Sequence, residues 1–505
     1  MQSGTDPIGT IISDAETPTF ETVRIKLKTG QDVKPGTLIR VPVSRSNTNS
    51  MLIGRIRSAY EHNPQENPES INVRDTLAME ANYPVEEDST TIYRLAEAEL
   101  IEELIGQTMQ SPQTLPQSGA EVFIANDDEI VTTLGLAKDE SSGLRIGETV
   151  VGTTTEIILK REAIQRHLFL CGTTGSGKSY AMGVIAEELV KHNVPIVFID
   201  TQDEYSGLVE KLKGTVVEPG VDFTIRISSL AESELLDLLP AATTELQRDI
   251  AGRAFRELQS KLVSEDIAKF SINELLNRMK DVGPDLTESS GSISMAISRT
   301  GSLKRNKIFG EGIGKADWRK HMYPCLAINC KRLMTTQLQP IATAVLRELQ
   351  TLRLHHHIPP YVAIIDEAHL FVPEGEGSPC KQIIREGVRI GRHHGIAMVL
   401  MTQSPVDIDK RTIRQCNTRL VFALEPDQLD AIRGVKADAT EEMLNALSKM
   451  PQGTCLLSGT YESVKHTIPV KIRQRETPDS EGGKTPDIFK EMEEKWIDTI
   501  TKLKQ

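Results

Sequence analysis

The segment that most constrains the fold of this chain is residues 172–179, GTTGSGKS, which fit the pattern GxxxxGK[ST] in full. An apolar run, HLFLC, precedes the segment, and a helical pattern over residues 178–192 follows it. In such a loop, glycines let the backbone N–H groups point toward phosphate groups, and the helix N-terminus adds its positive dipole end. Strand, loop and helix in this order predict a phosphate-binding loop in an α/β core.

The loop and the start of its helix supply the predicted nucleotide-binding residues. These are Gly172, Thr173, Thr174, Gly175, Ser176, Gly177, Lys178, Ser179 and Tyr180. Lys178 is expected to reach the β- and γ-phosphates of the nucleotide, and Ser179 is expected to ligate Mg²⁺. The predicted cofactors are therefore ATP and Mg²⁺.

A second motif, VAIIDE, ends with Asp366 and Glu367 after four apolar residues. Ligands bind at the carboxyl ends of strands in parallel sheets, and two adjacent buried charges are costly without a functional reason. We expect Asp366 to hold Mg²⁺ through water and Glu367 to polarise the attacking water. Asp200 ends another apolar run, and Glu204 follows it. These two residues either complete the acidic side of the site or act as a helix cap and a surface acid.

Polar residues near the next predicted strand, residues 395–401, are further candidates. Gln403 either senses the γ-phosphate or positions water, or it makes a structural hydrogen bond. Arg385, Arg389 and Arg392 share one face of a predicted helix before this strand. They form either a solvated basic face or the source of an arginine that reaches the nucleotide of an adjacent subunit, with Arg392 preferred and Arg389 second. The predicted catalytic residues are Glu367, Arg392, Gln403 and Arg389.

The rest of the chain predicts three regions. Residues 1–150 contain short apolar runs separated by turn residues, and Val23, Ile25 and Leu27 alternate with basic residues, which is typical of a small β-barrel. Residues 151–472 alternate strands with helices and form the predicted ATPase core, with a helical insertion at about 230–320. Residues 473–505 read as a polar linker and an amphipathic helix. Within the insertion, the Ser- and Gly-rich residues 289–315 are expected to be partly loop.

Charge and composition limit the kinds of contact that the chain can make with nucleic acids and membranes. The formal net charge is −13, so the chain is a poor candidate for coating DNA over its whole surface, and nucleic-acid contact requires a local basic surface. Two basic groups either are solvated or meet phosphates: Arg299, Lys304, Arg305 and Lys307, and Lys410, Arg411 and Arg414. The six scattered cysteines predict buried thiols in a reducing compartment. No apolar run approaches the roughly 20 residues of a membrane span, so we expect a cytoplasmic protein without membrane contact.

The motifs taken together resemble a known family. The segments GTTGSGKS, IDTQDEY, IIDEAHLF, REGVRIGRHHGIAMVLMTQSP, QCNTRLVFAL and LSKMPQGTCLLSG resemble HerA-type ATPases of the HerA–FtsK superfamily in order and spacing. The N-terminal region resembles the HAS barrel of that family. The resemblance implies a RecA-like P-loop core, hexameric rings that thread duplex DNA, and ATP hydrolysis between subunits. Arg392 matches the arginine-finger segment, although His393 replaces the usual lysine. Residues 200–205 lack the Pro, His and Gly of the family segment.

The resemblance also predicts a function and partners. We expect an ATP-driven, homohexameric translocase on double-stranded DNA that works with a separate chain, either a nuclease of the NurA type in DNA-end processing or a sirtuin-type or other effector in anti-phage defence. Two alternatives stay open. One is a conjugation or secretion ATPase of the same superfamily. The other is a scaffold ring that uses ATP to regulate a partner enzyme.

Overall fold

The computed structural model describes residues 6–14, 17–45, 48–62, 93–106, 108–310, 318–375, 379–434 and 437–477. Two compact units divide the chain: residues 1–181 with 416–474, and residues 182–415 with 475–505. The division falls within helix α4, Lys178–Lys191. The predicted C-terminal amphipathic helix lies outside the described residues.

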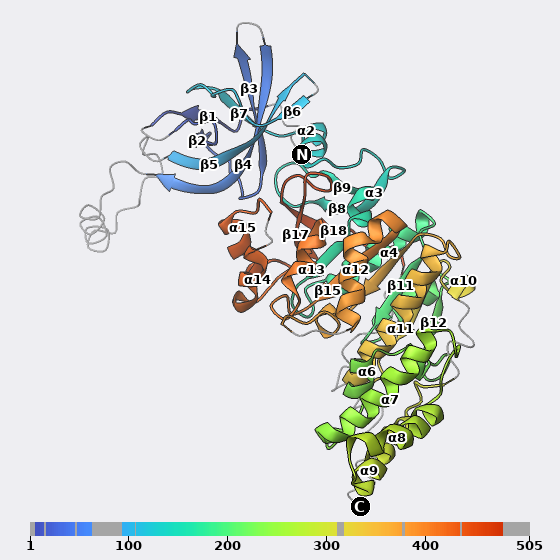
Figure 1. The fold of residues 1–505 in the computed structure, drawn as a ribbon. Helices are drawn as coiled ribbons and strands as arrows, with labels where there is room; N and C mark the ends of the chain where they lie inside the picture. Colours follow the sequence, from blue (N-terminus) through green and yellow to red (C-terminus); the bar gives the residue numbers. More distant parts are fainter. Residues whose placement is uncertain are drawn as a thin grey trace, which may run out of the picture. The chain divides into compact units, whose positions relative to one another are not determined.

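The first unit begins with a closed β-barrel (Figure 1). Its strands are β1 (Gly9–Ile12), β2 (Thr22–Leu27), β3 (Leu38–Arg45), β4 (Thr48–His62), β5 (Tyr93–Ile105), β6 (Thr108–Gln110) and β7 (Glu121–Ile124). The strand order is β2-β1-β7-β3-β4-β5-β6, and β2 also pairs with β5, so six strands close on themselves and β6 extends β5. Val23, Ile25 and Leu27 point into the barrel core, which confirms the predicted alternation.

A second sheet of the first unit carries the phosphate loop. Its strands, in spatial order, are β10 (Leu168–Cys171), β16 (Thr418–Val421), β17 (Thr454–Gly459), β18 (Ile468–Ile472), β8 (Gly143–Thr149) and β9 (Glu156–Lys160). β10 and β16 are parallel, whereas the later pairs are antiparallel. The helices of this unit are α2 (Asp127–Leu134), α3 (Arg161–Gln165), α14 (Leu429–Arg433) and α15 (Glu441–Ala446). The loop after β10 therefore lies beside the end of β16.

The second unit contains a parallel sheet. Its strands, in spatial order, are β12 (Thr215–Val217), β13 (Cys325–Asn329), β11 (Ile196–Asp200), β14 (Tyr361–Ile365) and β15 (Ile396–Thr402). All four pairings are parallel. The carboxyl ends of β11, β14 and β15 consequently meet at one edge, where the chain continues into polar residues.

Helices pack on this sheet and form the insertion. Helices α5 (Ser206–Lys211) and α12 (Pro379–His394) contact the sheet, and α11 (Thr335–Leu354) and α13 (Lys410–Gln415) contact α12. The insertion contains α6 (Glu232–Asp237), α7 (Glu245–Val263), α8 (Ile272–Leu286), α9 (Ser290–Gly301) and α10 (Trp318–His321). Figure 1 shows α7, α8 and α9 packed together.

Helix α9 occupies residues 290–301 of the Ser- and Gly-rich segment, whereas residues 306–310 are not helical, so the segment is partly loop as predicted. The Ser289 hydroxyl caps its start by accepting a hydrogen bond from the Ser292 backbone N–H at 3.2 Å. Ala296 and Thr300, one turn apart, are buried against the other helices of the insertion. Tertiary packing therefore overrides the weak helix propensity of the segment.

Two further predictions concern thiols and membranes. All six cysteines are free and buried, and burial raises the pKa of thiols such as Cys325 to about 12, which confirms the buried-thiol interpretation. In the part of the chain that the structure describes, no helix combines the length and apolar character that a bilayer span requires.

Candidate active site

The phosphate loop joins β10 to α4 in the first unit. Gly175 and Gly177 have φ values of 76° and 112°, a backbone region that favours glycine. A Cβ atom on Gly177 would lie 3.0 Å from the backbone nitrogen of Gly453, so this position also requires close backbone approach. The side chain of Thr174 is exposed and that of Ser176 is buried, whereas Ser179 is half-buried at the start of α4. The loop is thus shaped by positions at which only glycine fits without strain.

Neighbouring backbone fixes this loop in place. The Thr173 N–H donates to the Ala423 carbonyl at 2.8 Å, and the Gly453 N–H donates to the Ser176 carbonyl at 2.9 Å. Lys178 is only 8% exposed, and its Nζ donates to the carbonyls of Gly172 at 2.8 Å and Thr173 at 3.0 Å. The ammonium group is therefore held by two neutral carbonyl oxygens. Charged phosphate oxygens would bind it more strongly and can take their place.

Asp366 and Glu367 follow β14 in the second unit, and both are buried. The Thr201 hydroxyl donates to Asp366 Oδ2 at 3.0 Å. Burial raises the pKa of Asp366 well above its usual value, and the neighbouring carboxylates of Glu367, Glu204 and Asp200 raise it further. Negative charge is thus concentrated at this edge of the sheet, which is an environment that suits a divalent cation.

Glu367 is held by side chains from three segments. Its Oε1 accepts hydrogen bonds from Gln403 Nε2 at 2.5 Å and Gln202 Nε2 at 3.3 Å, and its Oε2 lies 3.2 Å from His369 Nδ1. Burial alone would raise the pKa of Glu367, but the contacts with His369 and Gln403 outweigh it and lower the pKa. The backbone of Glu367 is left-handed, with φ 46° and ψ 51°, a conformation that costs energy in a residue with a side chain. The carboxylate is therefore ionised and fixed in orientation.

Asp200, at the end of β11, organises the turn that carries Thr201 and Gln202. Its carboxylate accepts hydrogen bonds from the backbone N–H groups of Glu204 at 3.0 Å and Tyr205 at 2.9 Å. Burial raises the pKa of Asp200 to about 6, although these hydrogen bonds oppose the shift. Asp200 thus stabilises a turn and is not the N-cap of α5, which is Tyr205, while its charge contributes to the environment of Asp366.

The candidate arginines lie on α12 and are accessible. Arg389 is 70% exposed, and its guanidinium lies 3.9 Å from a carboxylate oxygen of Glu386. Arg392 is exposed near the end of the helix, and its Nε lies 3.3 Å from His393 Nε2. Gly391 allows α12 to approach β15, since a Cβ there would lie 2.7 Å from the Ile396 carbonyl oxygen. Neither arginine contacts Asp366 or Glu367 in the described part of the second unit.

Most of the chain is similar in sequence to known proteins. Residues 144–348 match the family described as Helicase HerA, central domain, and residues 342–473 match an AAA-like domain. The chain is 22% identical to the DNA double-strand break repair helicase HerA of Sulfolobus acidocaldarius, over 87% of this chain and 89% of that protein. The chain is similar to ATPases of the HerA–FtsK type over most of its length.

Other relatives agree with this assignment. The HerA helicase of Pyrococcus furiosus is 22% identical to the chain, over 72% of this chain and 74% of that protein. The structure of VirB4 of Thermoanaerobacter pseudethanolicus superimposes with a TM-score of 0.53 and 15% identity, covering 66% of this chain and 97% of that one, which supports the fold. The predicted HerA-type family, the α/β P-loop fold with its N-terminal barrel, ATP hydrolysis, and ATP with Mg²⁺ as cofactors are thereby confirmed. Residue roles and domain boundaries stay predictions.

The sequence interpretation missed three residues of this HerA-type site: Thr201, Gln202 and His369. Each follows an identified acid by one or two positions, because Thr201 and Gln202 come after Asp200 and His369 comes after Glu367. Sequence adjacency was the available signal. The contacts themselves depend on the pairing of β11 with β14, which brings residues 165 positions apart within hydrogen-bonding distance.

Proposed function

We propose that this HerA-type ATPase assembles as a homohexamer and moves along double-stranded DNA in the cytoplasm, driven by ATP hydrolysis. The observation that carries the proposal is the similarity, over most of the chain, to proteins named DNA double-strand break repair helicase HerA. The intact phosphate loop and the ordered Glu367 carboxylate support an active motor. A separate chain, either a NurA-like nuclease or a sirtuin-type or other effector, would process DNA ends or act in anti-phage defence.

In this proposal, the phosphate loop binds the nucleotide. The Lys178 ammonium leaves the carbonyls of Gly172 and Thr173 and binds phosphate oxygens, which carry more negative charge. The Ser179 hydroxyl and the Asp366 carboxylate would hold Mg²⁺, and the charge crowding at Asp366 suits that cation. When bound, Mg²⁺ supplies positive charge that stabilises the transferring phosphoryl group.

Glu367 would orient and polarise the attacking water. Its lowered pKa keeps the carboxylate ionised, and Gln202, His369 and Gln403 keep it in one orientation. We assign His369 and Gln202 as positioning residues, because they act through Glu367. Arg392, with Arg389 as second candidate, would donate to the nucleotide of an adjacent subunit, and the exposure of both side chains is compatible with that role.

The test is the rate of ATP hydrolysis with and without linear duplex DNA, on full-length protein whose mass in solution has been measured. We expect a hexamer whose hydrolysis is stimulated by DNA, and we expect Lys178→Ala to abolish the activity. A hexamer that hydrolyses ATP at the same rate with and without DNA would contradict the proposal. That result would favour a scaffold ring or an ATPase that moves protein.

A further inference from the structure

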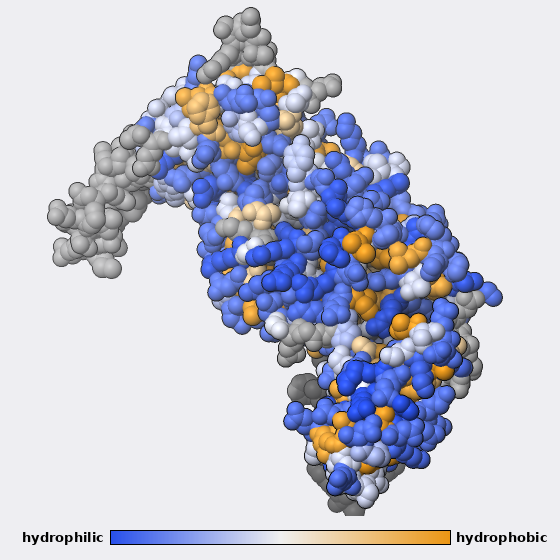
Figure 2. Space-filling view, in the orientation of Figure 1, coloured by the Kyte–Doolittle hydropathy of each residue, from blue (hydrophilic) through white to orange (hydrophobic). Residues whose placement is uncertain are grey.

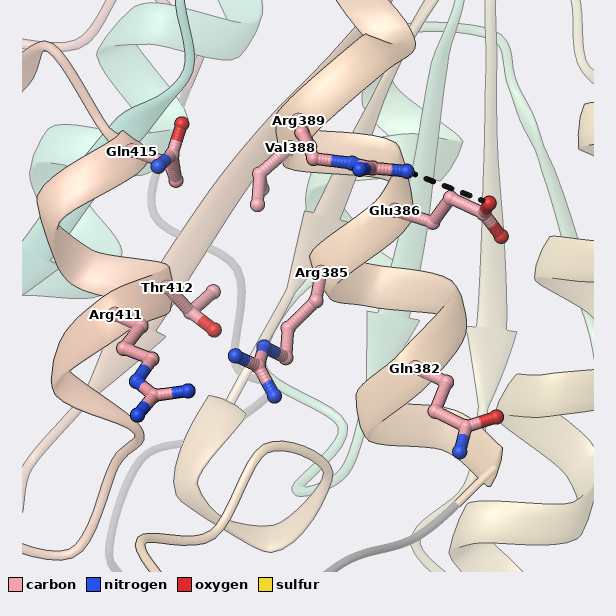
Figure 3. Close-up of a pocket in the computed structure, with 8 residues that line it drawn as sticks. All are labelled: Gln382, Arg385, Glu386, Val388, Arg389, Arg411, Thr412 and Gln415. Carbon is pink, nitrogen blue, oxygen red and sulfur yellow. Dashed lines mark ion pairs between the residues drawn. The ribbon is translucent and has the colours of Figure 1, made fainter.

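A groove with a basic lining lies between α12 and α13 in the second unit (Figure 3). Its volume is about 440 Å³. The lining residues are Gln382, Arg385, Glu386, Val388 and Arg389 from α12, and Arg411, Thr412 and Gln415 from α13. Three arginines and one glutamate give the lining a net positive charge in a chain whose net charge is −13. The face shown in Figure 2 is mainly hydrophilic over these two helices.

Two of these arginines face one another across the groove. Figure 3 shows the guanidinium groups of Arg385 and Arg411 pointing into the space from opposite sides, whereas Arg389 turns toward Glu386. Arg411 is exposed and has no ion-pair partner among the residues that the structure describes. Two cations that face the same space repel each other, so an anion between them would be stabilised by both.

Asp409 orients Arg385 but does not neutralise its charge completely. Asp409 Oδ2 lies 3.6 Å from Arg385 Nε, and the same carboxylate accepts hydrogen bonds from the Thr412 N–H at 3.0 Å and hydroxyl at 2.7 Å. Asp409 also lies 3.5 Å from the ammonium of Lys381, which is buried. One carboxylate therefore serves two cations and the start of α13. Positive charge remains available to a ligand.

We propose that this groove is a phosphate-binding site in which Arg385 and Arg411 hold one phosphate group between them. Each guanidinium presents a planar fork of N–H donors, and the tetrahedral arrangement of phosphate oxygens can accept from two forks on different helices. A carboxylate has only two oxygens, so a phosphate offers more acceptor positions to the two forks. The phosphate can belong to the backbone of duplex DNA or to a nucleotide. The DNA case rests on the proposed function, whereas phosphate binding itself does not.

The test compares the full-length protein with Arg411→Gln and with the double variant Arg385→Gln/Arg411→Gln. Binding of a fluorescent duplex is measured by anisotropy over a series of salt concentrations. Arg332→Gln is the matched control, because it removes one charge from a side chain that is 80% exposed and lies outside the groove. In a second arm, binding of inorganic tripolyphosphate is measured by calorimetry in a Lys178→Ala background, in which the phosphate loop is disabled. Melting temperatures show whether each variant is folded. Because Arg411 is exposed, we expect Arg411→Gln to fold like the wild type.

If DNA supplies the phosphate, each substitution weakens duplex binding roughly tenfold. The slope of log affinity against log salt becomes less steep by about 0.9 for each DNA phosphate that the variant no longer neutralises, and Arg332→Gln changes little. If a nucleotide supplies the phosphate, duplex binding is unchanged and tripolyphosphate binding disappears. Unchanged binding in both arms overturns the proposal. If the wild type fails to bind duplex DNA but Arg411→Gln abolishes tripolyphosphate binding, the proposed function fails while the groove assignment stands.

Discussion

Two clusters of carboxylates, one in each unit, differ in the charges that surround them. In the second unit, Asp366 is crowded by Glu367, Glu204 and Asp200, and its pKa is raised. In the first unit, Asp438 lies 2.9 Å from His466 Nδ1 and 3.3 Å from Arg55 Nη1. Burial would raise the pKa of Asp438, but these partners lower it well below its usual range.

The difference separates a cluster that stabilises the fold from one suited to chemistry. Arg55 is almost completely buried, and it also binds Glu99 and the carbonyls of Asp438 at 2.7 Å and Thr467 at 2.9 Å. This network links the barrel to the segment before β18, and its carboxylates are paired with Arg55 and His466. The charges that shift the pKa of Asp366 are carboxylates instead, and its hydrogen bond comes from a neutral hydroxyl. A cluster in which carboxylates repel one another is the one expected to bind a cation.

The largest effect should come from neutralising Glu367. Glu367→Gln removes the negative charge that polarises water, so kcat should fall by about 10²–10⁴-fold while the melting temperature stays close to that of the wild type. Asp438→Asn is the matched substitution in the other cluster, and it should lower the melting temperature without changing kcat at low temperature. Steady-state hydrolysis and thermal unfolding of both variants measure this. Equal loss of kcat in the two variants would show that the two carboxylate clusters do not differ in their role in catalysis.

Removing Arg55 should give the next largest effect, on stability. Arg55→Met removes the cation that pairs with Glu99 and leaves Asp438 with His466 alone, and we expect the free energy of unfolding to fall by about 3 kcal/mol. This value is at the low end for buried pairs because both carboxylates are partly exposed. Denaturant unfolding gives the number. Arg57→Met, two residues further along the same strand, is the control, and a similar loss there would show that the network is not the cause.

A smaller effect is expected from His369, which contacts Glu367 and, at 3.0 Å, the Thr402 hydroxyl. His369→Ala should lower kcat roughly tenfold, equivalent to the loss of one hydrogen bond, with little change in KM. The rate should also become less sensitive to Gln202→Ala, since both residues act through the same carboxylate. Additive losses in the double variant would argue against a shared positioning role.

The smallest effect is a pH dependence of stability in the first unit. Burial alone would lower the pKa of His466, but contacts with Asp438 and with Glu102, at 3.5 Å, raise it. Lys465 also faces Glu102, at 3.6 Å. A raised pKa in the folded state stabilises the fold below the unfolded pKa, and this stabilisation is lost as the pH rises through the folded value. The free energy of unfolding should therefore fall as the pH rises above the unfolded histidine pKa of about 6.5 and through the higher folded pKa, and the fall should shrink in His466→Gln. A flat profile in the wild type would exclude this contribution.

The same contrast explains what could be predicted from the sequence. The phosphate loop is contiguous, so its residues and its flanking strand and helix were evident from spacing alone, as were Asp366 and Glu367 at the end of an apolar run. The Arg55 network joins residues 383 to 412 positions apart, and no local pattern indicates it. Helix α9 was not evident from its Ser- and Gly-rich sequence, because its stability comes from packing against α7 and α8. Charge balance between distant residues becomes visible only in the folded chain.

In the proposed function, ATP hydrolysis assisted by Glu367 drives movement along duplex DNA. The most direct test is displacement of a third strand from a linear duplex by full-length protein, since displacement requires directed movement and not binding alone. We predict displacement with ATP, none with a non-hydrolysable analogue, and none with Glu367→Gln even though this variant binds nucleotide. Displacement by Glu367→Gln at the wild-type rate, or none by an active hexameric wild type, would contradict the account.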